Sequence, residues 1–240
     1  MIELNKAYLG DCLEVMNGID EKSIDLIATD LPYGTTRNPW DSVIDFIELW
    51  KQYERIIKDN GAIVLTACQP FTSALVMSNP KLFKYDLVWD KSNVTGFLNA
   101  KKMPLRKHES ILVFYKKPPT YNPQFTEGKP YKTKAKNRST TPNYNKFKLV
   151  DSESDGRRYP VSVLKFNGDR GLHPTQKPVA LFEYLIKTYT NPGDLVLDNC
   201  AGSGTAGVSA KNTGRNYILI EKDEKYFEII NKRLKGDEYS

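Results

Sequence analysis

A carboxylate, a rigid turn and an aromatic ring occur together at residues 30–33, which read Asp30-Leu31-Pro32-Tyr33. They follow the apolar run 23–29, which is typical of a buried strand, and ligands bind at the carboxyl ends of strands in open α/β sheets. The Asp30 carboxylate and the Leu31 carbonyl are placed to accept the two hydrogens of an amino group on an aromatic ring. Pro32 fixes the turn, and Tyr33 can stack on that ring. An ordinary Asx-Pro turn has the same pattern and stays open as an alternative.

A glycine-rich turn at residues 198–207 reads DNCAGSGTAG, and its last six residues fit G-x-G-x-x-G. It follows a predicted strand and opens a predicted helix, which is the context in which this pattern binds a cofactor. Glycines there let a ligand approach the backbone closely. Glu221 ends the next predicted strand, where an acid can accept hydrogen bonds from ribose hydroxyls. A dinucleotide site or a purely structural turn would share these features.

Asp11 follows a short strand-like segment, Tyr8-Leu9-Gly10. If that segment lies beside the strand that ends at Glu221, Asp11 can reach the adenine amino group of a cofactor. The alternative is an N-cap for a helix that begins near Leu13, because Asp is a favoured capping residue.

The positive charge is concentrated in one part of the chain. The 240 residues carry a formal charge of +6, whereas residues 116–148 alone hold nine Lys or Arg and one acid, Glu127. Residues 116–170 show no steady periodicity and interleave aromatic residues with these cations. A segment of this kind predicts a substrate-contacting insertion with phosphate contacts, although a solvated or mobile loop has the same composition.

Composition excludes several classes of protein. Hydrophobic residues make up 40% of the chain, and no run approaches the 18 apolar residues of a membrane span. The N-terminus does not resemble a signal peptide. Cys12, Cys68 and Cys200 are widely spaced, and the two histidines have no neighbouring ligand, so neither a metal site nor a disulfide framework is expected. We therefore expect a cytoplasmic protein.

These residues need a scaffold of alternating strands and helices. Apolar runs predict strands at 23–29, 62–66, 85–89, 110–115, 194–198 and 217–221. Helical spacing predicts helices at 43–57, 178–188, 205–212 and 225–234, with a break at Asn60-Gly61. The alternation indicates an open, mostly parallel sheet flanked by helices. In the fold that we predict, a late strand near 110–115 is antiparallel.

Three motifs together resemble a known family. Residues 30–33 are similar to the D/N/S-P-P-Y signature of DNA amino-methyltransferases, and residues 198–205 to their D-P-F-x-G-S-G-T motif. Residues 173–178, HPTQKP, are close to H-P-T-x-K-P in the same enzymes. The order of the motifs resembles the β group of N6-adenine and N4-cytosine DNA methyltransferases, over nearly the whole chain. Leu31 replaces the first Pro of the signature, and Asn199-Cys200 replaces Pro-Phe.

The resemblance implies a Rossmann-like sheet that binds S-adenosylmethionine (SAM), with the motifs in circularly permuted order. Residues 1–115 would form the catalytic half, 116–170 a DNA target-recognition insertion, and 171–240 the SAM-binding half. Leu31 should preserve the chemistry, because the hydrogen bonds fall on the Asp30 carboxylate and a backbone carbonyl.

The resemblance also implies site residues. Asp30, Leu31, Pro32 and Tyr33 would be catalytic. Lys177 would close around the methionine end of SAM together with Thr175, although on its own it reads as a solvated lysine. The implied SAM-binding residues are Asp11, Cys12, Asp30, Thr175, Lys177, Asp198, Ala201, Gly202, Ser203, Gly204, Thr205 and Glu221. The implied DNA-binding residues are Lys129, Lys132, Lys134, Lys136, Arg138, Lys146 and Lys148.

The predicted activity is transfer of a methyl group from SAM to N6 of adenine in duplex DNA, by base flipping and direct in-line transfer. Asp rather than Ser at position 30 favours adenine, and N4 of cytosine is the first alternative. A catalytically weak DNA-binding protein that retains SAM, or a nicotinamide-dependent oxidoreductase, are others. Double-stranded DNA is the expected partner, and the resemblance also allows a homodimer and a cognate restriction endonuclease.

Overall fold

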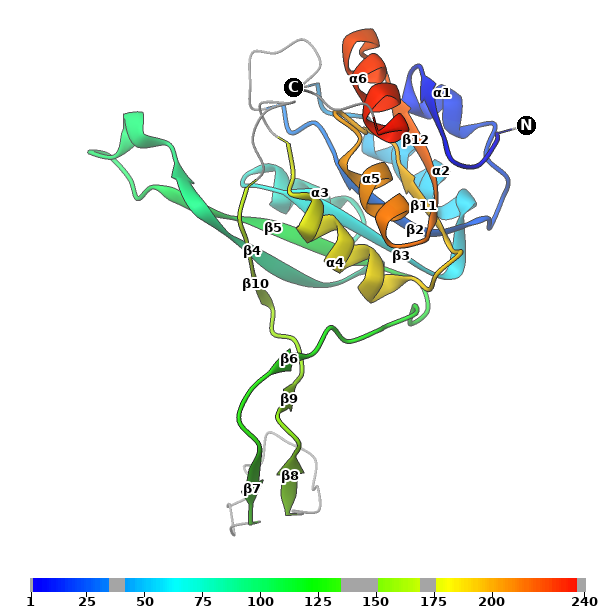
Figure 1. The fold of residues 1–240 in the computed structure, drawn as a ribbon. Helices are drawn as coiled ribbons and strands as arrows, with labels where there is room; N and C mark the ends of the chain where they lie inside the picture. Colours follow the sequence, from blue (N-terminus) through cyan, green and yellow to red (C-terminus); the bar gives the residue numbers. More distant parts are fainter. Residues whose placement is uncertain (1, 35–41, 135–150, 169–175, 237–240) are drawn as a thin grey trace. The chain divides into compact units, whose positions relative to one another are not determined.

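The computed structural model describes residues 2–34, 42–134, 151–168 and 176–236 (Figure 1). The chain divides into two compact units, one of residues 1–122 with 162–240 and one of residues 123–161. The larger unit holds a sheet in the order β1-β12-β11-β2-β3-β5-β4-β10. Its strands are β1 (Lys6–Leu9), β2 (Ile24–Asp30), β3 (Ile57–Ala67), β4 (Phe83–Thr95), β5 (Arg106–Phe114), β10 (Val163–Phe166), β11 (Leu195–Asp198) and β12 (Asn216–Glu221).

Five neighbouring strands, β1, β12, β11, β2 and β3, are parallel. Strand β5 runs antiparallel to both β3 and β4, and β10 pairs parallel with β4. The predicted Rossmann-like sheet and its antiparallel strand near 110–115 are therefore confirmed. No helix among the described residues is long and apolar enough to cross a membrane.

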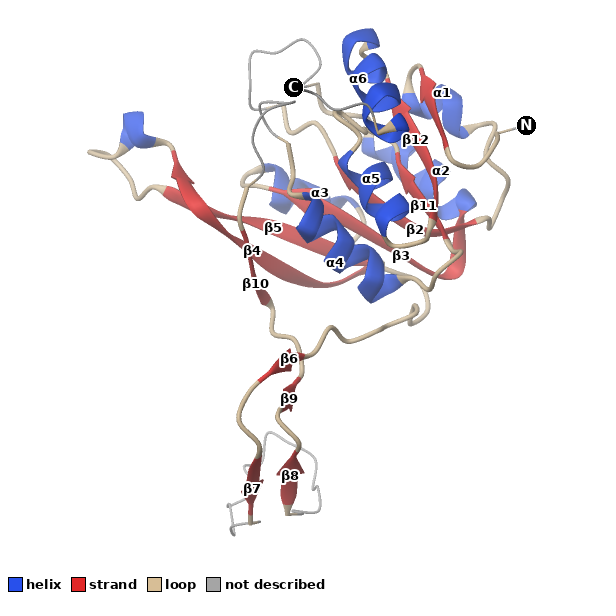
Figure 2. Ribbon diagram, in the orientation of Figure 1, coloured by secondary structure: helices blue, strands red, loops and turns tan. Residues whose placement is uncertain are grey.

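Helices cover both faces of the sheet (Figure 2). One core joins the sheet to α1 (Cys12–Met16), α2 (Phe46–Ile56) and α3 (Phe71–Ser78). The other joins it to α4 (Val179–Tyr189), α5 (Thr205–Asn212) and α6 (Glu224–Lys235). The two-residue period of a strand separates them, since Ile63 and Leu65 enter the first core while Ala62 and Val64 enter the second. Burial on both faces explains why the central strands are continuous apolar runs.

The structure differs from the predicted elements in several places. Strand β3 continues through Asn60-Gly61 instead of breaking there. Gly61 allows the backbone of β3 to lie close to that of β2, because a Cβ at this position would lie 2.9 Å from the Asp25 carbonyl oxygen. Helix α3 was not predicted, since its apolar residues surround it without a polar face. Strand β10 is too short, at four residues, to show a periodicity.

The smaller unit contains two short antiparallel pairs. Strand β6 (Thr126–Glu127) pairs with β9 (Arg157–Arg158), and β7 (Tyr131–Thr133) with β8 (Ser152–Ser154). Guanidinium groups lie over aromatic rings along it, with Arg157 at 5.3 Å from the Phe125 ring centroid and Arg158 at 4.8 Å from that of Tyr131. Cation–π contacts therefore accompany the strand pairing in this unit.

Candidate active site

The predicted catalytic and cofactor motifs meet at the centre of the sheet. Strands β2 and β11 are parallel neighbours, so Asp30 and Asp198 stand at the same edge although 168 positions separate them in the chain. The Thr29 hydroxyl donates to the Asp198 carboxylate at 2.6 Å and links the two strand ends. From this point the chain crosses over in opposite directions, to β3 on one side and to β12 on the other. Such a switch point is where ligands bind in open α/β sheets.

A cavity of about 400 Å³ opens at this edge. That volume lies within the usual range for small-molecule sites. Most residues that the sequence singled out line it: Asp11, Cys12, Asp30, Leu31, Pro32, Tyr33, Lys177, Asp198, Ala201, Gly202, Ser203, Thr205 and Glu221. Gly204 lies in the turn beneath, and Thr175 lies outside the described residues. Residues that sequence reasoning missed, including Ile44 and Tyr226, complete the wall.

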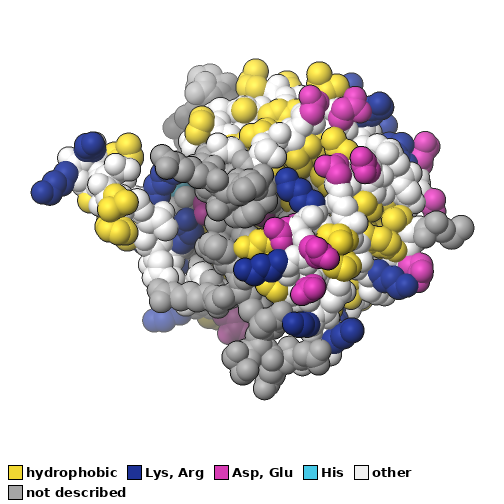
Figure 3. Space-filling view, turned by 90° about the horizontal axis from the view of Figure 1, so that it is seen from above, with side chains coloured by type: hydrophobic (Ala, Val, Ile, Leu, Met, Phe, Trp, Pro, Cys, Tyr) yellow, Lys and Arg dark blue, Asp and Glu magenta, His cyan; other side chains and the backbone are white. Residues whose placement is uncertain are grey.

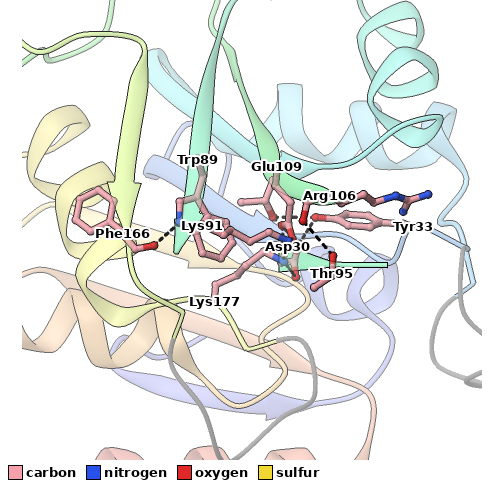
Figure 4. Close-up of polar contacts among 10 residues, drawn as sticks. Asp30, Tyr33, Trp89, Lys91, Thr95, Arg106, Glu109, Phe166 and Lys177 are labelled. Atoms are coloured by element: carbon pink, nitrogen blue, oxygen red, sulfur yellow. Dashed lines mark hydrogen bonds and ion pairs between the residues drawn. The ribbon is translucent and has the colours of Figure 1, made fainter. Parts of the chain in front are cut away.

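Three side chains hold the Asp30 carboxylate, and Figure 4 labels two of them, Tyr33 and Lys177. The hydroxyl groups of Tyr33, at 2.6 Å, and of Thr66 both donate to Oδ1, and the Lys177 ammonium donates to Oδ2 at 2.6 Å. A carboxylate offers about four lone-pair sites, so one site on Oδ2 remains for a ligand. Burial, followed by the Asp30 and Glu109 charges, raises the pKa of Tyr33 well above its usual value, so the phenol remains a donor.

Lys177 is buried between two carboxylates and is not a solvated lysine. Its side chain is 7% exposed, and its ammonium lies 2.6 Å from Asp30 and 3.3 Å from Glu109. Burial alone lowers the pKa of Lys177, but the charges of Asp30 and Glu109 outweigh it and raise that pKa. Lys91 lies 2.8 Å from the other oxygen of Glu109. Two cations therefore balance two carboxylates in a largely buried cluster.

Sequence reasoning missed Glu109, Lys91 and Thr66. Each stands near an end of an apolar run, but the sequence does not show which runs share an edge of the sheet. Because β5 is antiparallel to β3, the start of β5 lies beside the carboxyl end of β3 and hence near Asp30. The pairing of strands, rather than any local pattern, brings these residues to the site.

The glycine-rich turn leaves its backbone open to a ligand. Gly202 has φ +52° and no atom within 4 Å of where a Cβ would stand, whereas a Cβ on Gly207 would meet the Leu219 side chain at 2.5 Å. The first glycine thus permits approach to the cavity, and the last permits α5 to pack closely on β12. The Gly202 amide donates to Glu221 at 2.6 Å. Burial raises the pKa of Glu221, whose carboxylate faces the same cavity.

The residues that depart from the family motif have partners in this protein. The buried Asn199 side chain accepts a hydrogen bond from the Tyr53 hydroxyl at 2.6 Å. Interaction between the two thiols lowers the pKa of Cys12 and raises that of Cys200, and the Asn199 amide nitrogen lies 3.5 Å from the Cys200 sulfur. Burial raises the pKa of the neighbouring Asp198 to about 7. The floor of the cavity is therefore built from polar groups where the family motif has Pro-Phe.

Asp11 is the N-cap of a helix and also lines the cavity. Its side chain accepts a hydrogen bond from the Leu13 amide at 2.9 Å and caps α1. It also lines the cavity, because β1 pairs with β12 so that Leu9 stands beside Glu221.

The basic residues assigned to DNA binding are described only in part. Lys129, Lys132 and Lys134 are exposed in the smaller unit, and Lys132 pairs with Glu153 at 2.7 Å. Lys136, Arg138, Lys146 and Lys148 lie outside the described residues.

Comparisons with known proteins agree with this geometry. The sequence model of the DNA methylase family matches residues 24–232. The chain is 31% identical to the type II methyltransferase M.HinfI of Haemophilus influenzae, over 97% of this chain and 68% of that protein. It is 29% identical to the type II methyltransferase M1.MboII of Moraxella bovis, over 96% of each.

Solved structures show the same relationship. The M1.HpyAVI–SAM complex matches with a TM-score of 0.65 and 26% identity, over 95% of this chain and 98% of that one. The cytosine-N4-specific PvuII DNA methyltransferase matches with a TM-score of 0.68 over 96% of this chain and 93% of that one. At 18% identity, the second likeness shows the fold alone. A nicotinamide-dependent oxidoreductase is left without support, and the chain belongs to the DNA methylase family as a SAM-dependent methyltransferase of N6-adenine or N4-cytosine in DNA.

Proposed function

We propose that the chain methylates N6 of adenine in duplex DNA, and that Asp30 and the Leu31 carbonyl accept the two hydrogens of the target amino group. The observation that carries this proposal is the free lone-pair site on Asp30, at the mouth of the cavity that the cofactor turn also lines. The acid at position 30, where the family signature also allows Asn or Ser, favours adenine over cytosine.

The amino group is a poor nucleophile because its lone pair is delocalised into the ring. Two acceptors can hold the amino hydrogens out of the ring plane. The lone pair is then no longer delocalised into the ring and is available for attack. The nitrogen–carbon bond then forms as the sulfur–carbon bond breaks, the bonding pair stays on sulfur, and the amino group releases one proton. Asp30 stands where that proton leaves. Positioning of this kind supplies much of the rate of a two-substrate reaction.

The cavity residues fit SAM, which when bound supplies the methyl group on a positively charged sulfur. Glu221 uses one oxygen for the Gly202 amide and the other for the Asp223 amide at 2.9 Å, which leaves lone pairs for ribose hydroxyls. Asp11 would accept a hydrogen bond from the adenine amino group. Lys177 has a third donor beyond its two carboxylates, which would bind the methionine carboxylate next to Thr175.

The target base must leave the stack before it can reach Asp30. Residues 116–170 would recognise the duplex, with the seven Lys and Arg residues named above on phosphates, which makes affinity sensitive to salt. No covalent intermediate is required, because the amino nitrogen attacks the methyl group directly. A homodimer and a partner endonuclease are further parts of this proposal, to be tested by sedimentation and by genetic context.

The direct test follows label from tritiated SAM into mixed-sequence duplex DNA, which is then digested to nucleosides. Label in N6-methyladenine that disappears in Asp30→Ala supports the proposal, provided that Asp86→Ala, which removes an exposed carboxylate on β4, keeps full activity. Label in N4-methylcytosine keeps the mechanism and changes the target. Absence of label, with SAM binding intact, favours the catalytically weak DNA-binding protein.

A further inference from the structure

An exposed arm joins β4 to β5 and combines positive charge with apolar side chains. The arm comprises residues 91–108, which include Lys101, Lys102 and Arg106, and which contain no Asp or Glu. Phe97 and Leu98, at its tip, are 75% and 85% exposed. In the space-filling view, hydrophobic and basic side chains gather on this projection (Figure 3). Exposed apolar clusters on a charged surface mark interaction sites.

The arm is ordered by its own hydrogen bonds rather than by packing. Strands β4 and β5 pair as far as Thr95 and Arg106. Gly96 then takes φ +87° and starts a 3-10 turn (Phe97–Asn99), in which the Asn99 amide donates to the Gly96 carbonyl at 2.9 Å. This geometry holds the apolar side chains of the tip outward, in the solvent.

The arm begins and ends at the active-site ion cluster. Lys91, its first residue, pairs at 2.8 Å with Glu109, which directly follows its last residue. Glu109 in turn lies 3.3 Å from Lys177, which pairs with Asp30 (Figure 4). Because β5 starts beside the carboxyl end of β3, the arm extends from the edge of the sheet that carries Asp30 (Figure 1).

We propose that the arm contacts duplex DNA beside the target base, with Lys101, Lys102 and Arg106 on phosphates and with Phe97 and Leu98 against the bases that the flipped nucleotide leaves. This inference rests on the proposed function and assigns a DNA contact outside residues 116–170. Apolar side chains inserted at a base step stabilise an opened duplex, and flanking cations bind its backbone. The charge disfavours a second copy as the occupant, since two arms meeting across a two-fold axis would repel each other.

The tip is tested by the double variant Phe97→Ser/Leu98→Ser. We expect label from tritiated SAM in mixed-sequence duplex DNA to fall at least tenfold, while SAM affinity by tryptophan fluorescence and the melting temperature stay unchanged. The matched control is Met77→Ser, because Met77 is 72% exposed on α3, outside the arm. If the tip variant labels DNA as well as Met77→Ser does, Phe97 and Leu98 do not contact the bases and the proposal is overturned.

The cations are tested by Lys101→Gln/Lys102→Gln, with binding to a fluorescent 30-base-pair duplex measured at several salt concentrations. Loss of two phosphate contacts should lower affinity and reduce the slope of log affinity against log salt by about 2. An unchanged slope overturns the proposal. It is also overturned if sedimentation shows that the wild type is a dimer and that the tip variant alone is a monomer. If the wild type labels no DNA, the proposed function fails. The binding measurement still shows whether the arm contacts DNA, because it does not depend on methyl transfer.

Discussion

The positive and negative charges in the cluster around Asp30 cancel, and removing them singly and in pairs tests whether this balance stabilises the fold. Asp30 and Glu109 face Lys91 and Lys177, so Lys177→Met leaves one excess negative charge and Glu109→Gln one excess positive charge. Removing one partner of a buried ion pair costs about 3–5 kcal/mol. Because 24% of the Asp30 side chain remains exposed, we expect the lower end, about 3 kcal/mol in the free energy of unfolding for each variant.

The double variant Lys177→Met/Glu109→Gln restores neutrality. It should cost about 3 kcal/mol rather than the additive sum of about 6, which is a coupling of about 3 kcal/mol, at the upper end of the range for contacting residues. Urea unfolding of the ligand-free protein at pH 7.5, followed by tryptophan fluorescence, measures all three variants. The control is Lys187→Met, whose half-exposed ion pair with Glu183 at 3.5 Å should contribute less than about 0.5 kcal/mol.

The pH dependence of these variants follows from the same charges. The pKa of Glu109 is lowered because Lys177 and Lys91 outweigh its burial, so its contribution is present above its usual pKa and is lost as pH falls. The raised pKa of Lys177 places the loss of its contribution only at strongly alkaline pH. Without Lys177, protonation relieves the excess carboxylate, so the penalty of Lys177→Met should shrink by about 1 kcal/mol at pH 5. Additive single variants, or a penalty independent of pH, would refute this account of the cluster.

Three further outcomes are expected. Because burial raises the pKa of Asp198 to about 7, the free energy of unfolding of the wild type should fall as pH rises from about 4 to 7. Asp198→Asn should lack this loss. Between pH 5 and 8 it should therefore gain about 2 kcal/mol relative to the wild type, as measured by urea unfolding. Gly207→Ala should cost about 1–3 kcal/mol by overpacking against Leu219, while Gly168→Ala, with open space around it, should be neutral in thermal melts. Tyr33→Phe keeps the ring but removes one hydrogen bond to Asp30, the proposed acceptor, so kcat should fall about tenfold with KM for SAM unchanged.

Sequence patterns predicted the site residues that directly follow a strand. They did not predict the site residues that only the pairing of distant strands brings to the cavity. Asp30, Asp198 and Glu221 each follow an apolar run, so a local pattern placed them at one edge of a parallel sheet. Glu109 also adjoins an apolar run, and the antiparallel direction of that strand was predicted. Its place beside Lys177, however, depends on which strand β5 pairs with, and no local pattern specifies that partner. The same limit explains the arm, because the pairing of β4 with β5 continues beyond the predicted strands into polar sequence.

Lys177 links the two functions that the permuted chain order separates. Its carbonyl oxygen accepts a hydrogen bond from the Thr205 hydroxyl at 3.3 Å, at the start of α5, while its ammonium pairs with Asp30. The residue therefore connects the glycine-rich turn to the Asp30 carboxylate through its own backbone and side chain. The order of motifs in the chain does not affect this connection, because it depends on β2 and β11 being neighbours in the sheet. We therefore expect a ligand on the cofactor turn to affect the orientation of Asp30 through one buried side chain.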